Sequence, residues 1–259
     1  MILVTRHAML TGALAAGLSL SLAACVSTNP SPIVEANAPT PSAPPISAGS
    51  TPQYSADVSP EYAAMYGPVT DEPYPIAGVD LTQVNHDFLR KEVDYKTDQP
   101  PGTIIVDPDH HYLYHVLPGG RAMRYGVGVG REGFGWSGVA TIHNKQEWPD
   151  WYPPPEMFAR QPDIKPYMSQ LQSGLGMPGG ADNPLGARAM YLWEDNKDTL
   201  FRIHGTNEPW TIGTSVSSGC IRMINQDVID LYSQTPAGTK VIVLGPGVTA
   251  SLGGSKRSG

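Results

Sequence analysis

The chain has 259 residues, with 24 acidic and 17 basic side chains and a net charge of −7. An acidic chain without clusters of lysine and arginine argues against nucleic acid as a partner, because protein affinity for nucleic acid depends largely on phosphate contacts. Its two cysteines are too few for a disulfide-rich scaffold.

The first 25 residues have the pattern of an export signal. Arg6 and His7 precede an apolar stretch at 8–22 that is too short for a comfortable membrane span. The sequence Leu-Ala-Ala-Cys that ends at Cys25 is similar to a bacterial lipobox, in which this cysteine is lipidated and becomes the mature N-terminus. Ordinary signal cleavage is the alternative. We therefore expect a protein of the periplasm or cell envelope, held to a membrane by a lipid on Cys25.

Residues 26–58 are rich in proline, serine and alanine and carry almost no charge, which predicts a disordered tether. Residues 59–100 are predicted to form an arm that packs on the following domain. Within it, 80–93 is predicted to hold one short helix with Val84, Phe88 and Leu89 on its apolar face.

Short strands are predicted from Gly102 onward. The segments 103–107 and 112–116 have the pattern of a hairpin around 108–110, and 121–129 continues it. The glycines at 126–130 have the wrong spacing for a dinucleotide-binding motif, so they predict bends where backbones approach closely.

A proline-rich stretch at 148–157 is predicted to lack regular structure. It is interpreted either as a rigid loop with a small core of its own or as a wall beside a cleft, and the two are compatible. Further strands are predicted at 189–193 and 240–244, followed by a disordered tail at 246–259.

Three histidines lie close together in sequence, and metal binding is one interpretation of such a cluster. His110, His111 and His115 stand near Asp107 and Asp109, but neither zinc-finger spacing nor a His-Glu-x-x-His motif is present. The sequence therefore predicts no metal ligands and no cofactor.

The stretch from residue 200 to 232 carries the residues with the clearest chemical meaning. Phe201 and Ile203 alternate with Arg202 and His204, which is typical of a half-buried strand, and Cys220 follows in a Ser-Ser-Gly-Cys turn. A neighbouring imidazole is the usual means of activating a thiol. After the cysteine, a helix capped by Asn225 is predicted, with Val228, Leu231 and Tyr232 on one face.

The motif of His204-Gly205-Thr206 followed by 217–223, Ser-Ser-Gly-Cys-Ile-Arg-Met, resembles the signature of the L,D-transpeptidases of the YkuD catalytic-domain family. Ser218 stands where many members have a second histidine, and Arg222 where many have asparagine. The resemblance covers residues 101–245 and implies a mostly β fold: a mixed sandwich or partial barrel with a few short helices.

The resemblance also implies the role of each motif residue. Cys220 is the expected nucleophile and His204 its base. Backbone N–H groups of Ser218, Gly219 and Cys220 are the expected oxyanion donors. We expect Ser217 to hold the turn or the imidazole. Arg222 would bind a carboxylate of the substrate, with an ion pair bracing the turn as the alternative. Gly205 would let the backbone pass close to this turn.

The implied reaction is acyl transfer between peptidoglycan stem peptides, from the third residue of a tetrapeptide to an amine, with release of D-alanine. The acceptor is left open: a second stem peptide, a lysine of an outer-membrane lipoprotein, or water. A carboxypeptidase of the same fold and a non-catalytic wall-associated lipoprotein are the alternatives. A papain-type protease is disfavoured because its cysteine precedes its histidine in sequence.

Overall fold

The computed structural model describes residues 54–55, 57–131, 135–217 and 219–248. The predicted signal segment, Cys25, nearly all of the predicted tether and most of the predicted tail lie outside the described residues. The chain divides into two units, Met1–Ser47 and Ala48–Gly259, and every described residue belongs to the second. No helix in the described ranges has the length and apolarity needed to cross a membrane.

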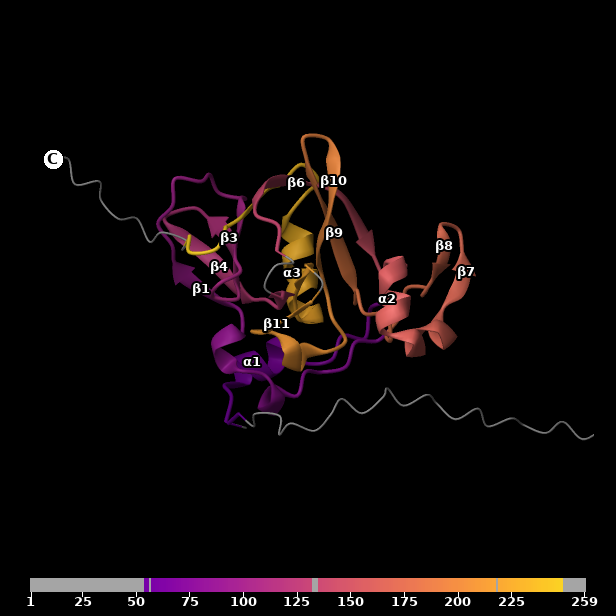
Figure 1. Cartoon of the computed structure of the whole chain (residues 1–259). Helices are drawn as coiled ribbons and strands as arrows, with labels where there is room; N and C mark the ends of the chain where they lie inside the picture. The colour runs from indigo at the N-terminus through magenta and orange to yellow at the C-terminus, as the bar shows by residue number, and fades with distance from the viewer. Residues whose placement is uncertain (1–53, 56, 132–134, 218, 249–259) are drawn as a thin grey trace, which may run out of the picture. The chain divides into compact units, whose positions relative to one another are not determined.

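A nine-stranded mixed sheet organises the described residues (Figure 1). In spatial order its strands are β1 (Lys91–Asp94), β4 (Arg121–Gly126), β3 (Tyr112–Leu117), β2 (Ile104–Asp107), β13 (Lys240–Val243), β6 (Gly138–Glu147), β9 (Arg188–Glu194), β10 (Lys197–His204) and β12 (Ile221–Arg222). The predicted hairpin of β2 and β3 is confirmed, and β4 continues it as predicted. The predicted last strand, β13, lies between β2 and β6, parallel to β2 and antiparallel to β6.

The remaining elements are short. They are the paired strands β5 (Val129–Gly130) and β11 (Ser215–Ser217), the paired strands β7 (Ser169–Leu171) and β8 (Gly174–Gly176), the helices α1 (Pro60–Met65), α2 (Pro155–Arg160) and α3 (Asn225–Gln234), and the 3₁₀ turns η1 (Leu81–Gln83), η2 (His86–Phe88), η3 (Pro162–Tyr167) and η4 (Pro209–Thr211). The predicted class, mostly β with a few short helices, is confirmed.

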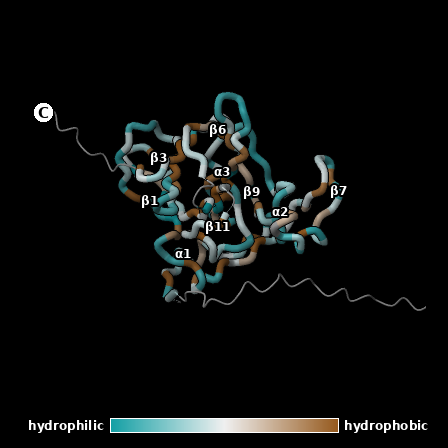
Figure 2. The backbone as a smooth tube through the Cα atoms, in the orientation of Figure 1, coloured by the Kyte–Doolittle hydropathy of each residue, from teal (hydrophilic) through white to brown (hydrophobic). Residues whose placement is uncertain are grey.

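The main core lies between one face of the sheet and α3. Met190 and Leu192 of β9, Ile203 of β10, and Val228 and Leu231 of α3 are all buried in one cluster. Figure 2 shows hydrophobic residues along the strands and a hydrophilic turn between β9 and β10. Because successive strand residues point to opposite faces, the neighbours of these core residues face the other side of the sheet.

The helix predicted for 80–93 is wrong: this segment forms η1, η2 and the start of β1. The side chain of Asp80 accepts a hydrogen bond from the Thr82 N–H, and that of Asn85 accepts one from the Asp87 N–H. Such local turns compete with a continuous helix. The apolar residues still reach the core, since Val84 and Leu89 are buried.

The expectation of no regular structure at 148–157 is wrong at its end, because Pro155 begins α2. Proline suits a first helical position, where its missing N–H would have no partner. Trp148 packs edge-on against Tyr74 of the arm and donates its indole N–H to Glu72. This part of the stretch therefore contacts the arm.

Candidate active site

His204 and Cys220 come together through the parallel pairing of β10 and β12. Ile203 pairs with Ile221, and His204 pairs with Arg222. Cys220 directly precedes β12, so continuing this register places it beside Arg202. Paired strands lie about 4.8 Å apart, which makes His204 and Cys220 diagonal neighbours on adjacent strands.

These side chains also share one face of the sheet. Ile203 and Ile221 belong to the main core, so the alternating positions point to the opposite face. That face carries Arg202 and His204 from β10, with Cys220 and Arg222 from the β12 side. The thiol of a partly exposed cysteine residue and a buried imidazole thus share this face with two guanidinium groups.

His204 is held by the backbone around it. Its Nδ1 lies 2.6 Å from the Gly205 carbonyl oxygen, a contact in which the protonated nitrogen donates. The side chain is only 5% exposed. Burial lowers the pKa of His204 to about 4, although the carbonyls of Gly205 and Leu185 oppose that shift. The imidazole is therefore neutral at pH 7 and able to accept a proton.

The Cys220 thiol is also neutral at rest. Burial raises the pKa of its thiol, while the Arg202 guanidinium, the Arg202 backbone N–H and the Arg222 guanidinium act to lower it. The residue as a whole nevertheless keeps part of its surface exposed. A thiolate would thus form when a proton is removed, with two positive charges near it.

The turn before Cys220 is braced by Ser217. Its hydroxyl donates to the Cys220 carbonyl oxygen at 2.8 Å and accepts from the Gly219 N–H at 3.1 Å. Ser217 therefore holds the turn, and the Gly219 N–H points to it. Gly219 has a φ of 125°, a conformation that favours glycine. Ser218, the third expected oxyanion donor, lies outside the described residues.

Arg222 of β12 has a mostly buried side chain. Its side chain is 11% exposed, and its Nη1 lies 3.6 Å from a Glu208 carboxylate oxygen. Its Nε and Nη2 are buried and have no hydrogen-bond partner among the described residues. A Cβ added to Gly128 would lie 3.2 Å from this Nη2. The ion pair expected as an alternative role is thus present, but it engages only part of the guanidinium.

The segment after His204 packs against the start of α3: the three atoms nearest to a Cβ added at Gly205 belong to Asn225, Ala187 and Val228. The predicted cap of α3 is wrong, because Asn225 is the first helical residue and its side-chain oxygen accepts the Ala187 N–H at 3.0 Å. A long-range hydrogen bond to the residue before β9 has replaced the local one.

The side chains of His110, His111 and His115 lie in three different environments. His110 contacts Asp107, His111 contacts the Ser215 hydroxyl at 2.9 Å, and His115 is buried in β3. The described part of the chain holds no group of three or more potential metal-binding side chains.

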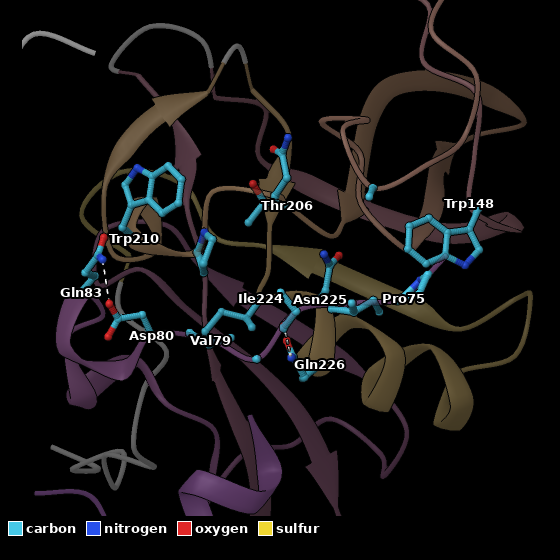
Figure 3. A pocket seen from close by; sticks show the side chains of 16 residues that line it. Pro75, Val79, Asp80, Gln83, Trp148, Thr206, Trp210, Ile224, Asn225 and Gln226 are labelled. Atoms are coloured by element: carbon cyan, nitrogen blue, oxygen red, sulfur yellow. Dashed lines mark hydrogen bonds between the residues drawn. The ribbon is translucent and has the colours of Figure 1, made fainter. Parts of the chain in front are cut away.

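A cavity of about 340 Å³ lies between the arm and the loop after His204 (Figure 3). Its lining includes Asp80 and Gln83 of the arm, Thr206 and Trp210 of the loop, and the start of α3. Neither Cys220 nor His204 lines this cavity, so it is separate from the thiol and the imidazole.

Sequence reasoning assigned no role to Arg202 or to Tyr191. Arg202 precedes His204 by two positions, so strand alternation alone placed it on the same face. The pairing of Arg202 with Tyr191 of β9 depends on the sheet. No local pattern in the sequence signalled that contact.

A family model for the L,D-transpeptidase catalytic domain, YkuD, matches residues 101–243. The chain is similar to the "Probable L,D-transpeptidase ErfK/SrfK" of Escherichia coli strain K12, with 33% identity over 149 residues, which are 54% of this chain and 43% of that protein. It is 32% identical over 159 residues to "Probable L,D-transpeptidase YcfS" of the same strain, covering 60% of this chain and 47% of that protein. The chain thus spans about half the length of these curated relatives.

A solved structure from Brucella melitensis, described as a probable carnitine operon oxidoreductase, is 48% identical and covers 62% of this chain and 96% of its own, with a TM-score of 0.41. An L,D-transpeptidase from Mycobacterium smegmatis is 17% identical and covers 56% of this chain and 59% of its own, with a TM-score of 0.39. At these TM-scores the structural likenesses carry no argument about function.

Proposed function

Since this chain belongs to the family with the YkuD L,D-transpeptidase catalytic domain, we propose that it is a cysteine-dependent acyltransferase of peptidoglycan stem peptides. The observation that carries the proposal is that His204 ends β10 and Cys220 directly precedes the parallel strand β12, with both side chains expected on the same side of the sheet. A cysteine residue with part of its surface exposed, beside a buried neutral imidazole, supports nucleophilic catalysis.

In the first step, His204 takes the proton of the Cys220 thiol as Sγ attacks the carbonyl carbon of the third stem residue, diaminopimelate. The Sγ–C bond forms, the C–N bond to D-alanine breaks, and His204 passes the proton to the leaving amine. A thioester remains. In the second step an acceptor amine attacks that carbon, the C–S bond breaks, and the amine proton returns to sulfur through His204.

The Cys220 N–H is the candidate oxyanion donor that the geometry leaves open, because the Gly219 N–H donates to Ser217. Ser218 stays a candidate on sequence grounds alone. Arg222 is proposed to bind a carboxylate of the stem peptide, for which a planar guanidinium is suited, through the Nη1 side that now faces Glu208. Gly205 contributes by keeping the segment after His204 against α3.

The proposed setting is the cell envelope, with the enzyme anchored to a membrane through a lipid on Cys25. The proposed partners are peptidoglycan stem peptides and, as an acyl acceptor, either a second stem peptide or a lysine of an outer-membrane lipoprotein. The relatives support this setting only through their description as L,D-transpeptidases.

The test is incubation of the purified chain with a disaccharide tetrapeptide, followed by mass spectrometry. A transpeptidase yields free D-alanine and a cross-linked product, and Cys220→Ala abolishes both. Cys25→Ala is the matched cysteine control and should retain both products. D-alanine without cross-linked product, even when a lysine peptide is added, identifies a carboxypeptidase. Neither product from the unaltered chain would identify a non-catalytic lipoprotein and end the proposal.

A further inference from the structure

Arg202 lies closest in register to the proposed nucleophile. Continuing the β10–β12 pairing places it directly across from Cys220, on the face of the sheet that also carries His204. On its other side, Arg202 pairs with Tyr191 of β9. Its guanidinium is therefore carried by the strand next to the edge of the sheet, between Tyr191 of β9 and Cys220.

The Arg202 guanidinium is held in one orientation. Its Nη1 and Nη2 donate to the two carboxylate oxygens of Asp198 at 2.8 and 2.9 Å, and Nη1 also donates to the Phe201 carbonyl. The group lies over the Tyr191 ring, 4.6 Å from its centroid. Fixed on three sides, it has little rotational freedom left to lose when it binds a ligand.

One edge of this guanidinium is left without a partner. A guanidinium offers two bidentate edges to carboxylates, and Asp198 occupies only the Nη1/Nη2 edge. Within the part of the chain that the structure describes, the Nε–H of Arg202 has no hydrogen-bond partner. Its Nε is also absent from the enclosed polar atoms, which include the Nε and Nη2 of Arg222.

The two arginines beside Cys220 therefore differ. The Arg222 side chain is 11% exposed with its free edge enclosed, whereas the Arg202 side chain is 18% exposed with its Nε accessible. We propose that Arg202 is a specificity-determining residue whose Nε/Nη2 edge binds the terminal carboxylate of the D-amino acid that leaves the donor peptide.

This inference rests on the proposed function. In that reaction the leaving residue carries its free carboxylate one residue beyond the scissile bond, so a cation beside the nucleophile is suitably placed to bind it. Other carboxylates of the stem lie further from the scissile carbon along side chains. Recognition of the terminal carboxylate would favour tetrapeptides over longer stems, in which that group is part of another peptide bond.

The experiment compares two donor peptides that differ only at this group: a tetrapeptide ending in D-alanine and one ending in D-alaninamide. We measure kcat/KM for release of the fourth residue with the unaltered full chain and with Arg202→Gln. A charge-assisted bidentate contact predicts that the unaltered chain prefers the carboxylate by about 10- to 100-fold. Arg202→Gln should lose this preference and process the amide as well as the unaltered chain does.

Asp198→Ala is the control for a structural role of Arg202 in β10. It removes the carboxylate that accepts hydrogen bonds from the Leu200 N–H and the Arg202 guanidinium, and it keeps the arginine charge. It should retain most of the preference for the carboxylate. Arg222→Gln is the control for a cation at another position. It should lower turnover of both peptides by the same factor and leave the preference unchanged.

Equal losses on both peptides in Arg202→Gln would overturn the inference, since they identify a merely structural role. The absence of any preference in the unaltered chain would overturn it as well. Failure of the unaltered chain to release the fourth residue from either peptide would instead remove the proposed function, and this inference with it.

Discussion

At the residue scale, the proposed catalytic pair is neutral at rest. The pKa of His204 is lowered to about 4 by burial, and the pKa of the Cys220 thiol is raised by burial. A preformed thiolate–imidazolium pair needs the opposite shifts. We infer that proton transfer accompanies attack on the substrate, and that Arg202 and Arg222 stabilise the thiolate as it forms.

The first prediction concerns the pH dependence of Cys220 reactivity. In a Cys25→Ser background, the rate of alkylation by iodoacetamide should rise with pH and pass its midpoint above about 8.5, the value of an ordinary thiol. The reason is that only the thiolate reacts, and burial disfavours it. Labelling is followed by mass spectrometry, with Cys220→Ala as the blank. A rate that is already constant between about pH 5 and 7 would show a preformed ion pair.

The second prediction concerns Gly205. An added Cβ would lie 2.1 Å from the Asn225 side-chain oxygen and 3.1 Å from the Ala187 nitrogen. Gly205→Ala should therefore destabilise the protein by about 1–3 kcal/mol, because it forces apart a packed contact between the sheet and α3. Urea denaturation measures the change.

Gly135 offers the matched control, because no atom of the described residues lies within 4 Å of a Cβ placed there. Gly135→Ala should change stability by less than about 0.5 kcal/mol. Equal effects of the two substitutions would contradict the packing argument.

At the scale of elements, the arm is fastened to α3 by a buried polar cluster. The Tyr66 hydroxyl donates to Asp227, which is fully buried, and Arg90 lies 3.8 Å from Asp227 and 3.2 Å from Asp230. Asp230 also accepts a hydrogen bond from the Tyr125 hydroxyl. Burial raises the pKa of Asp227 to about 7, and Arg90 opposes that shift.

The third prediction follows from this shift. Because the pKa of Asp227 is higher in the folded state than in the unfolded state, its contribution to stability is complete below about pH 4 and is lost as pH rises through 7. Asp227→Asn cannot lose a proton, so the variant should gain stability relative to the unaltered chain as pH rises from 4.5 to 7.5. Urea denaturation at both values checks it. A relative loss of stability by the variant over this range would refute the raised pKa.

At the scale of the whole described unit, the arm completes a second core. Leu81, Val84 and Leu89 of the arm pack with two isoleucines. Ile212 lies between β10 and β12, and Ile224 follows β12. An ion pair between Glu72 of the arm and Arg188 of β9 also joins the arm to the large sheet. The family model begins at residue 101, so the region it matches excludes the arm that covers this cluster.

The fourth prediction is that a chain beginning at residue 101 does not fold stably. Removing the arm exposes Ile212 and Ile224, and burial of each large apolar side chain contributes about 1.5–3 kcal/mol. The truncated chain should show a lower unfolding midpoint or aggregate, whereas a chain beginning at residue 54 should match the full one. Circular dichroism during thermal unfolding compares the three chains. Identical midpoints for all three would show that the arm is dispensable.

Local chemistry in the sequence was sufficient for much of the strand pattern. Short apolar runs next to turn residues predicted β2, β3, β9 and β13, and the alternation of Phe201 and Ile203 with Arg202 and His204 predicted the end of β10. The helix predicted at 80–93 failed because Asp80 and Asn85 close short turns. The cap predicted at Asn225 failed because its side chain accepts a hydrogen bond from the N–H of Ala187, the residue before β9.

The sequence by itself determined the chemical identity of the proposed site, since a histidine, a turn glycine and a cysteine in that order are local features. The structure alone decided which side chains surround them. The parallel pairing of β10 with β12 placed Arg202 beside Cys220 and enclosed one edge of Arg222. Strand pairing and burial depend on residues far apart along the chain. The positions of the two guanidinium groups beside Cys220, and the solvent exposure of each, are therefore fixed only when the sheet is assembled.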